Sequence, residues 1–408
     1  MVGGGIFAVL GLAVQLAGAG APVAFLVAGL VALLTARSYA LLSASYPSRG
    51  GTVTFLNRAF GPARFAGGLN VLLWVSYIVM LALYAQAFGA YAASFLPLSA
   101  QGLWKHLFLT AALLALTALN VAGAATVARA ERIIVAIKIA ILLVFVAVGL
   151  AGISTARLAP AHWSAPVSLI AGGMIIFLAY EGFELIANAA EDVTDPGRTL
   201  TRAYYICVVF VIALYVLIAI VAVGSLPIPE LVNARDYALA AAARPTLGQT
   251  GFAIIAVAAM LSTASAINAT LYGSARLTYV IAKSGELPSQ LERPIWGQPL
   301  EGLLITAAST IILANLMDLT NIATMGSAGF LIIFAAVNLA EARTASERGS
   351  APWISTLAAI TCVAALLALI TDSTPAAVLV LLVMVAASFG IEFLFRGFAA
   401  RSSSEPPT

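Results

Sequence analysis

Three consecutive glycines and one interrupted apolar stretch are the features of this chain best suited to binding a small charged solute. Gly3, Gly4 and Gly5 open the first apolar stretch, and the tetrapeptide Ala-Tyr-Glu-Gly at 179–182 lies deep inside another. Glycines let a ligand approach the backbone closely, and the helix that follows them presents its positive dipole end to a carboxylate. Backbone carbonyls freed by the second interruption suit an ammonium group. Together the interruptions predict a site for a molecule with both groups, such as an α-amino acid.

Other side chains near these interruptions allow two interpretations each. The glycines could instead serve only close helix packing, as small residues do in membranes. Glu181 and Glu184 lie in an apolar stretch, where a charge costs roughly 2.5–3.5 kcal/mol or more unless it is paired, protonated or facing water. Glu181 could pair with a cationic substrate or accept structural hydrogen bonds from Tyr or Ser. The flanking aromatic and apolar residues could gate a site or pack the helices.

Lys138 is a second ionisable residue in an apolar stretch. It follows Arg132 by six residues, which places it about 9 Å deeper along a helix. At that depth the side chain could extend back to the membrane surface. Alternatively, a buried lysine can release and regain a proton during a transport cycle.

The elements that position these residues are membrane-spanning helices. The chain is 62% hydrophobic and 9% charged, whereas an average soluble domain is about 25% charged. Apolar runs of the length that spans a bilayer, about 20 residues, recur along the sequence. They predict an all-α integral membrane protein with twelve spans, at 1–16, 21–43, 66–96, 104–122, 131–153, 167–190, 202–224, 250–283, 299–316, 321–340, 353–371 and 375–396.

The distribution of Lys and Arg predicts the orientation. With both termini in the cytoplasm, the inner loops and tail hold 13 of the 20 basic residues, the outer loops 4 and the spans 3. Positive charge concentrates in cytoplasmic loops, so we expect a multi-pass protein of the cell membrane with cytoplasmic N- and C-termini. The outer segment between about Leu226 and Leu247 is long enough to form a small external cap.

Several separate motifs resemble those of the amino acid–polyamine–organocation (APC) permeases. The first helix of that superfamily typically reads Ile-Gly-Ser-Gly-Ile-Phe, and residues 2–7 here read Val-Gly-Gly-Gly-Ile-Phe. The other matching motifs are Tyr39 to Leu42 followed by Pro47 to Gly51, Gly182-Phe183-Glu184, Asp195 to Arg198, Ala275-Arg276 and Gly285 to Pro288. The resemblance covers the chain to about residue 340, and no single motif would be specific.

The resemblance implies a LeuT-type fold of two inverted five-helix repeats with broken first and sixth helices. It places the repeats at 1–153 and 167–340, two additional helices at 353–396 and a disordered cytoplasmic tail at 397–408. Relatives have a half-helix before the glycines of the first helix. Met1 aligns with an internal residue of those proteins, so either the true start lies upstream or the half-helix is missing here, which would leave the first helix truncated and the inner gate incomplete.

The resemblance also implies a transporter that imports amino acids by alternating access, as the superfamily's proton-coupled members do. Those members place a lysine where sodium symporters hold an ion between the first and eighth helices, and Lys138 matches that lysine. The implied substrate-binding residues are Gly3, Gly4, Gly5, Ile6, Phe177, Leu178, Ala179, Tyr180, Glu181 and Gly182. The implied proton-coupling residues are Lys138, Glu184, Ser262 and Thr263, with Ser265 as a further hydroxyl facing the lysine.

Two other functions remain open at this point. Glu181 favours a carrier or exchanger of cationic amino acids or polyamines, and the missing half-helix is compatible with a membrane nutrient sensor that does not transport. An enzyme is not expected, because no metal-ligand cluster, nucleophile–base pair or phosphate loop is recognisable. We expect no cofactor other than the coupled proton, no metal and no nucleic acid, and the sequence indicates no obligatory protein partner beside the lipid bilayer.

Overall fold

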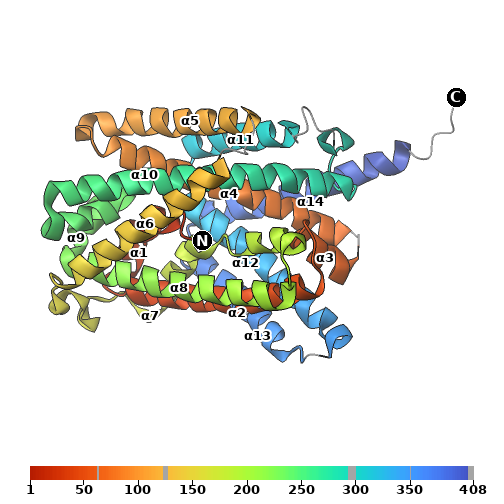
Figure 1. The fold of residues 1–408 in the computed structure, drawn as a ribbon, viewed down its shortest axis with the longest axis horizontal. Helices are drawn as coiled ribbons and strands as arrows, with labels where there is room; N and C mark the ends of the chain where they lie inside the picture. The colour runs from red at the N-terminus through yellow and green to blue at the C-terminus, as the bar shows by residue number, and fades with distance from the viewer. Residues whose placement is uncertain (62–63, 123–126, 293–299, 350, 403–408) are drawn as a thin grey trace.

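The protein is a bundle of α-helices that lie roughly along one common axis (Figure 1). The computed structural model describes residues 1–61, 64–122, 127–292, 300–349 and 351–402 of the chain. In these ranges ten helices are long and apolar enough to cross a membrane, and two shorter apolar helices, Gly5–Ala17 and Leu300–Leu316, accompany them. The predicted all-α membrane bundle with about twelve spans is therefore confirmed.

The first half of the chain forms six α-helices. They are α1 (Gly5–Ala17), α2 (Ala21–Ser45), α3 (Thr52–Phe60), α4 (Arg64–Ala93), α5 (Leu98–Ala122) and α6 (Val127–Leu150). Two short 3-10 helices, η2 (Thr155–Leu158) and η3 (Pro160–His162), lead into the second half.

The described residues of the second half form the interrupted helix and seven further α-helices. The interrupted helix consists of α7 (Pro166–Ile175), η4 (Ile176–Tyr180) and η5 (Glu184–Asp192). The remaining elements are α8 (Pro196–Ser225), α9 (Ile228–Asn233), η6 (Arg235–Tyr237), α10 (Ala238–Lys283), η7 (Ser289–Glu292), α11 (Leu300–Leu316), α12 (Leu319–Thr344), η8 (Ala345–Arg348), α13 (Trp353–Thr371) and α14 (Pro375–Ser402).

Local sequence signals explain several helix ends. Asp195 caps α8 by accepting a hydrogen bond from the Arg198 backbone N–H at 3.4 Å, and Pro196 begins the helix, as prolines often do. Asp318 caps α12 by accepting from the Asn321 N–H at 2.8 Å. The long α10 bends at Gly248, whose φ of 64° is non-helical. Glycine adopts that backbone conformation without the steric cost of a side chain.

Two of the predicted boundaries change. Residues 1–4 are not helical, so α1 begins only at Gly5. At the other end α14 continues to Ser402, so the disorder predicted from residue 397 does not begin there, and residues 403–408 lie outside the described residues. The segment predicted to form a cap is compact, because α9 and η6 pack against α1, and its external position stays a prediction.

Helices α4 and α12 form the centre of the bundle, since most of their side chains are buried. The start of α1 and the interruption between η4 and η5 lie beside them, enclosed further by α2 and α10. The candidate site therefore sits in the middle of the bundle, away from the helices that face lipid. The division into two inverted repeats stays a prediction.

Candidate substrate and coupling site

The start of α1 exposes backbone N–H groups inside the bundle. Gly4 accepts the first hydrogen bond of the helix from the Ala8 N–H at 2.9 Å. Among the described residues no acceptor is found for the N–H groups of Gly5 and Phe7, which are two of the unpaired donors that a helix start leaves, whereas the Ile6 N–H faces the Tyr215 hydroxyl. Because Gly5 and Phe7 are buried, their N–H groups point into the protein interior, where an anionic group would satisfy them.

The second interruption lies where the sequence predicts it. Glu181 has extended backbone geometry with φ −61° and ψ 157°, and Gly182 has a φ of 108°. In the described part of the chain no donor reaches the carbonyls of Ala179, Tyr180 and Glu181. The Ser327 hydroxyl of α12 fixes the residues before the interruption, because it accepts from the Leu178 N–H at 3.0 Å and donates to the Ile175 carbonyl at 2.7 Å.

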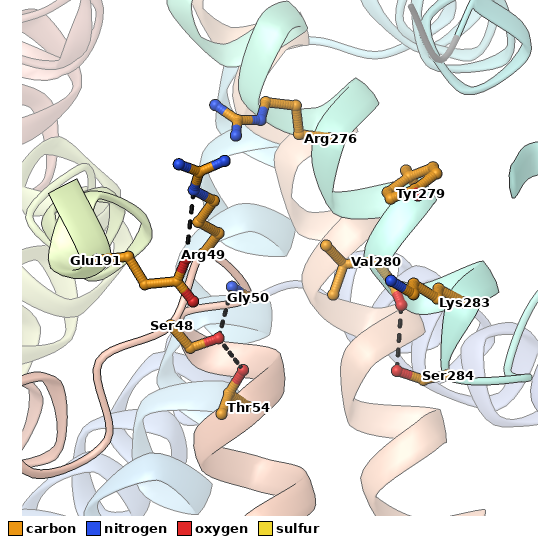
Figure 2. A pocket seen from close by; sticks show the side chains of 10 residues that line it. All are labelled: Ser48, Arg49, Gly50, Thr54, Glu191, Arg276, Tyr279, Val280, Lys283 and Ser284. Atoms are coloured by element: carbon orange, nitrogen blue, oxygen red, sulfur yellow. Dashed lines mark hydrogen bonds and ion pairs between the residues drawn. The ribbon is translucent and has the colours of Figure 1, made fainter. Parts of the chain in front are cut away.

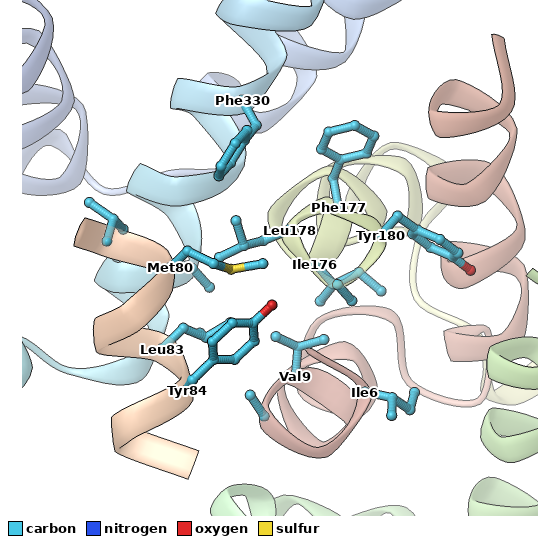
Figure 3. Packing of buried hydrophobic residues seen from close by; sticks show 14 of the residues in the cluster. Ile6, Val9, Met80, Leu83, Tyr84, Ile176, Phe177, Leu178, Tyr180 and Phe330 are labelled. Atoms are coloured by element: carbon cyan, nitrogen blue, oxygen red, sulfur yellow. The ribbon is translucent and has the colours of Figure 1, made fainter. Parts of the chain in front are cut away.

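The two interruptions are in direct contact. A Cβ placed on Gly5 would lie 2.7 Å from the Ala179 Cα and 2.9 Å from its carbonyl oxygen. Figure 3 shows Val9 of α1 facing Ile176 of the second interruption, with Tyr84 of α4 beside Val9. Unpaired N–H groups from one element and unpaired carbonyls from another therefore meet in one region.

Tyr84 and α10 close the other side of the α1 start. A Cβ on Gly4 would meet the Tyr84 ring and would lie 3.0 Å from the Thr263 Cγ2. The Ser262 hydroxyl donates to the Gly3 carbonyl at 2.9 Å, whereas the Thr263 hydroxyl donates back to the Ala259 carbonyl of its own helix. Of the two hydroxyls predicted to act in coupling, only Ser262 reaches α1.

Both carboxylates of the second interruption are buried. Glu181 is 4% exposed and Glu184 is 1% exposed. Glu184 accepts from the Tyr77 hydroxyl at 3.0 Å and from the Gly182 N–H at 2.7 Å, and the Glu181 carboxyl group adjoins it. No Lys or Arg within the described ranges forms an ion pair with either of them.

Lys138 is buried, as the interpretation of this residue as a proton carrier requires. It makes no hydrogen bond in the described structure to the hydroxyl groups that were predicted to face it. Its residue is 4% exposed, so it does not extend to the surface. In the part of the chain that the structure describes, no hydrogen bond or ion pair connects it to α1 or to Ser262, Thr263 or Ser265. The Ser265 hydroxyl instead donates to Glu131 Oε1 at 3.3 Å.

Comparison with known proteins assigns the family. A sequence model of the amino acid permease family matches residues 1–393. An uncharacterized protein of Methanocaldococcus jannaschii is 39% identical over 338 residues, covering 82% of this chain and 77% of the relative. The inner membrane transport protein YbaT of Escherichia coli is 37% identical over 345 residues, covering 83% and 79%. This chain belongs to the amino acid permease family.

A further relative of the permease is the branched-chain amino acid permease BcaP of Bacillus subtilis. It is 25% identical over 367 residues, which cover 83% of this permease and 77% of the relative. The family and these relatives make the protein a multi-pass membrane transporter of amino acids or related substrates, and not an enzyme.

The permease has an open cavity at one end of the bundle. It measures about 760 Å³ and is lined by Arg49, Glu191 and residues of α10 that include Arg276, Tyr279 and Lys283. Figure 2 shows the α10 side chains across the cavity from Arg49, which pairs with Glu191 at 3.4 Å. By the predicted orientation this end is cytoplasmic.

The opposite end of the permease is closed by the cap that α9 and η6 form. A Cβ on Gly11 of α1 would collide with the backbone of Arg235 in η6, so cap and helix touch without intervening side chains. Lys105 at the start of α5 forms a 2.8 Å ion pair with Asp236 of the same cap. The cap thus covers α1 at this end of the bundle, whereas the open cavity lies at the other end.

Sequence reasoning missed several residues that shape the site of the permease. Ser327 and Gly326 of α12 hold Leu178 in place, and no local motif marks them. Glu131 was detectable in principle, because it precedes Lys138 by seven residues and therefore shares its helix face.

Proposed function

We propose that this permease imports α-amino acids by alternating access, coupled to protons. The observation that carries the proposal is the contact between the two interruptions at Gly5 and Ala179, which brings unpaired donors and unpaired acceptors together in a buried region. Transporters with broken helices use such half-helix ends to bind charged substrate groups near the membrane midplane.

The arrangement suits a zwitterion. The substrate carboxylate would accept hydrogen bonds from the N–H groups of Gly5 and Phe7. Its ammonium would donate to the carbonyls of Ala179 and Tyr180. Phe177, Leu178, Tyr180 and Tyr84 would surround the remainder of the substrate, and Gly3, Gly4 and Gly182 would give the backbone room to approach it.

Proton coupling through Lys138 and Glu184 is the second part of the proposal. A buried amine and a buried carboxyl group each change charge when a proton binds, and each charge is costly at this depth. Alternating access would be carried by two inverted repeats at 1–153 and 167–340. The termini would be cytoplasmic, in the cell membrane.

The test is uptake into proteoliposomes of radiolabelled L-alanine, L-leucine, L-glutamate, L-arginine and putrescine, with and without an inward proton gradient. Accumulation of one class that increases with acid outside supports the proposal and identifies the substrate. Gradient-independent uptake contradicts the coupling, and binding without uptake would favour the sensor.

A cationic amino acid or polyamine is the second candidate substrate, and one observation favours it. Glu181 and Glu184 adjoin each other in the interior, and among the described residues no basic side chain forms an ion pair with them. The Met1 amino group lies beside Gly182 and acts on Glu181, and a substrate with a second ammonium group would add a further positive charge to the two carboxyl groups. In the uptake panel this predicts that L-arginine or putrescine competes most strongly.

A further inference from the structure

One face of α6 carries two ionisable groups that the proposed site does not explain together. Lys138 is buried among apolar neighbours, and within the described residues no hydrogen bond or ion pair reaches its ammonium group. Glu131 lies seven residues earlier, two helical turns or about 10 Å along the axis. It is half-buried near the beginning of the helix.

The helix geometry brings these two side chains toward each other. Side chains of an α-helix lean toward its N-terminus, so the long Lys138 side chain extends from its Cα toward Glu131. The Glu131 carboxylate is the charge that acts on Lys138 most directly. The two groups form no direct ion pair in the structure, so a proton would pass between them through a bridging water molecule or after a side-chain movement.

Glu131 is also connected to the substrate region. The Ser265 hydroxyl of α10 donates to it at 3.3 Å, and Ser262, three residues earlier, donates to the Gly3 carbonyl at 2.9 Å. Residues three apart lie on the same face of a helix. One side of α10 therefore contacts both Glu131 and the unwound start of α1.

Other charged groups on the neighbouring helices do not neutralise this pair. Helices α8 and α10 pack against α6. Their basic residues make no ion pair with Glu131 in the described ranges. Besides the pair itself, the charged and titratable residues in the sequence of these three helices are Arg129 and Arg132 on α6, Arg198, Arg202, Tyr204, Tyr205, Cys207 and Tyr215 on α8, and Arg244, Tyr272, Arg276, Tyr279 and Lys283 on α10.

We propose that Glu131 is the proton partner of Lys138, passing protons between its amine and the water at the α6 N-terminus. The inference rests on the proposed proton-coupled transport. In the releasing step the Lys138 ammonium gives one proton to the Glu131 carboxylate, leaving a neutral amine and a neutral carboxyl group. The carboxyl group then releases that proton to water and becomes a carboxylate again.

The same proton transfer would change a contact near the substrate region. A protonated Glu131 is a poorer acceptor for the Ser265 hydroxyl than a carboxylate. Loss of that bond loosens α6 from α10 beside Ser262, which holds the start of α1. The proton thus changes a contact that lies one helical turn from the substrate site.

The experiment compares four variants of the full chain in proteoliposomes with the substrate panel described above. The variants are Glu131→Gln, Glu131→Asp, Lys138→Met and the control Glu301→Gln, a half-buried acid in the first turn of α11. We expect E131Q to lose gradient-driven accumulation by about tenfold or more and to lose its dependence on outside pH. E131D should restore part of both, and E301Q should match the unmodified protein.

Two further measurements separate a proton role from a folding defect. Substrate counterflow at equal pH on both sides needs no net proton movement, so in E131Q it should fall by no more than about threefold. Infrared spectroscopy of the purified protein should show a protonated-carboxyl band that E131Q removes. In Lys138→Met, the pH at which this band appears should differ by about one unit or more.

The outcomes are distinguishable. If Lys138→Met abolishes the gradient response while E131Q retains it, the role of Glu131 is overturned and the proposed function stands. Equal loss of counterflow and gradient-driven uptake in E131Q, without rescue by E131D, would reduce Glu131 to a structural residue. Absence of acid-stimulated uptake in the unmodified protein overturns the proposed coupling and this relay with it.

Discussion

At the scale of single residues, the ionisable groups buried in the bundle dominate the chemistry. Glu181, Glu184 and Lys138 were all recognisable in the sequence, because a charge inside an apolar stretch stands out. Tyr77, the partner of Glu184, was not recognisable as such, because it is distant in sequence. Glu131 shares the helix face of Lys138, but whether that face meets Ser265 depends on the rotation of α6 against α10, and apolar periodicity does not fix that rotation to within one side chain.

Lys138 provides the first prediction. Lys138→Met and Lys138→Arg should both lose acid-stimulated uptake, since methionine carries no proton and arginine does not release one in proteins. The arginine variant keeps the positive charge and so controls for a merely structural cation. Uptake into proteoliposomes at a series of outside pH values measures this, and a normal acid response in Lys138→Arg would contradict the proton role.

Glu181 provides the second prediction. If its carboxylate faces a cationic substrate, Glu181→Gln should weaken L-arginine or putrescine binding by about tenfold or more, the effect of one lost buried charge contact of about 1.5–3 kcal/mol. L-leucine binding should change far less. Scintillation proximity binding to the same purified variant measures both ligands, and equal weakening of the two would count against a direct contact.

At the scale of elements, the two interruptions explain why the helices around them are so unequal. The glycines stop α1 from beginning before Gly5, and the turn at Gly182 divides η4 from η5. Both were predictable, because glycine clusters and family motifs mark them. The 3-10 geometry of η4 and η5 was not, since it arises from contacts with α12 and α2 that are distant in sequence.

The contact between the interruptions leads to the third prediction. A methyl group at Gly5 meets backbone atoms of Ala179, which cannot rotate away. Overpacking of about 1–3 kcal/mol corresponds to about a 5- to 150-fold loss of substrate affinity in Gly5→Ala. Gly102→Ala on α5 is the matched control, because a methyl group there meets nothing within 4 Å. Similar binding by both variants would show that the interruptions separate freely.

At the scale of the whole molecule, the described structure is open at the end with Arg276 and closed by the cap at the other. The number and order of helices followed from hydropathy. Hydropathy did not predict which end of the bundle is open. A bundle open at one end and a bundle open at the other bury nearly the same apolar sequence and differ only in how rigid parts are placed. Which end faces the cytoplasm rests on the charge count alone.

Closure of the cap gives the fourth prediction. Gly11→Val should displace the cap, because the added side chain would overlap the backbone of Arg235. Leu231 of α9 is fully buried. In a background with Cys207→Ala and Cys362→Ala, a Leu231→Cys reporter should therefore react several-fold faster with a maleimide when Gly11→Val is present.

The control for the cap experiment is Gly102→Val at the same end of the bundle, where the added side chain has open space. It should leave the reporter protected. Equal labelling of the reporter alone, with Gly11→Val and with Gly102→Val would mean that the contact between the cap and α1 does not control cap opening.

The main-chain character of the proposed anchor has an evolutionary consequence. Amide and carbonyl groups at Gly5 and Ala179 are present whatever side chains the gene encodes, so point mutations do not delete them. Selection can then vary the surrounding side chains, such as Leu178 or Tyr84, without first losing the hold on the part of the molecule that all amino acids share. A family of transporters with such a main-chain site can change its substrate range in single mutational steps, each of which leaves a working transporter.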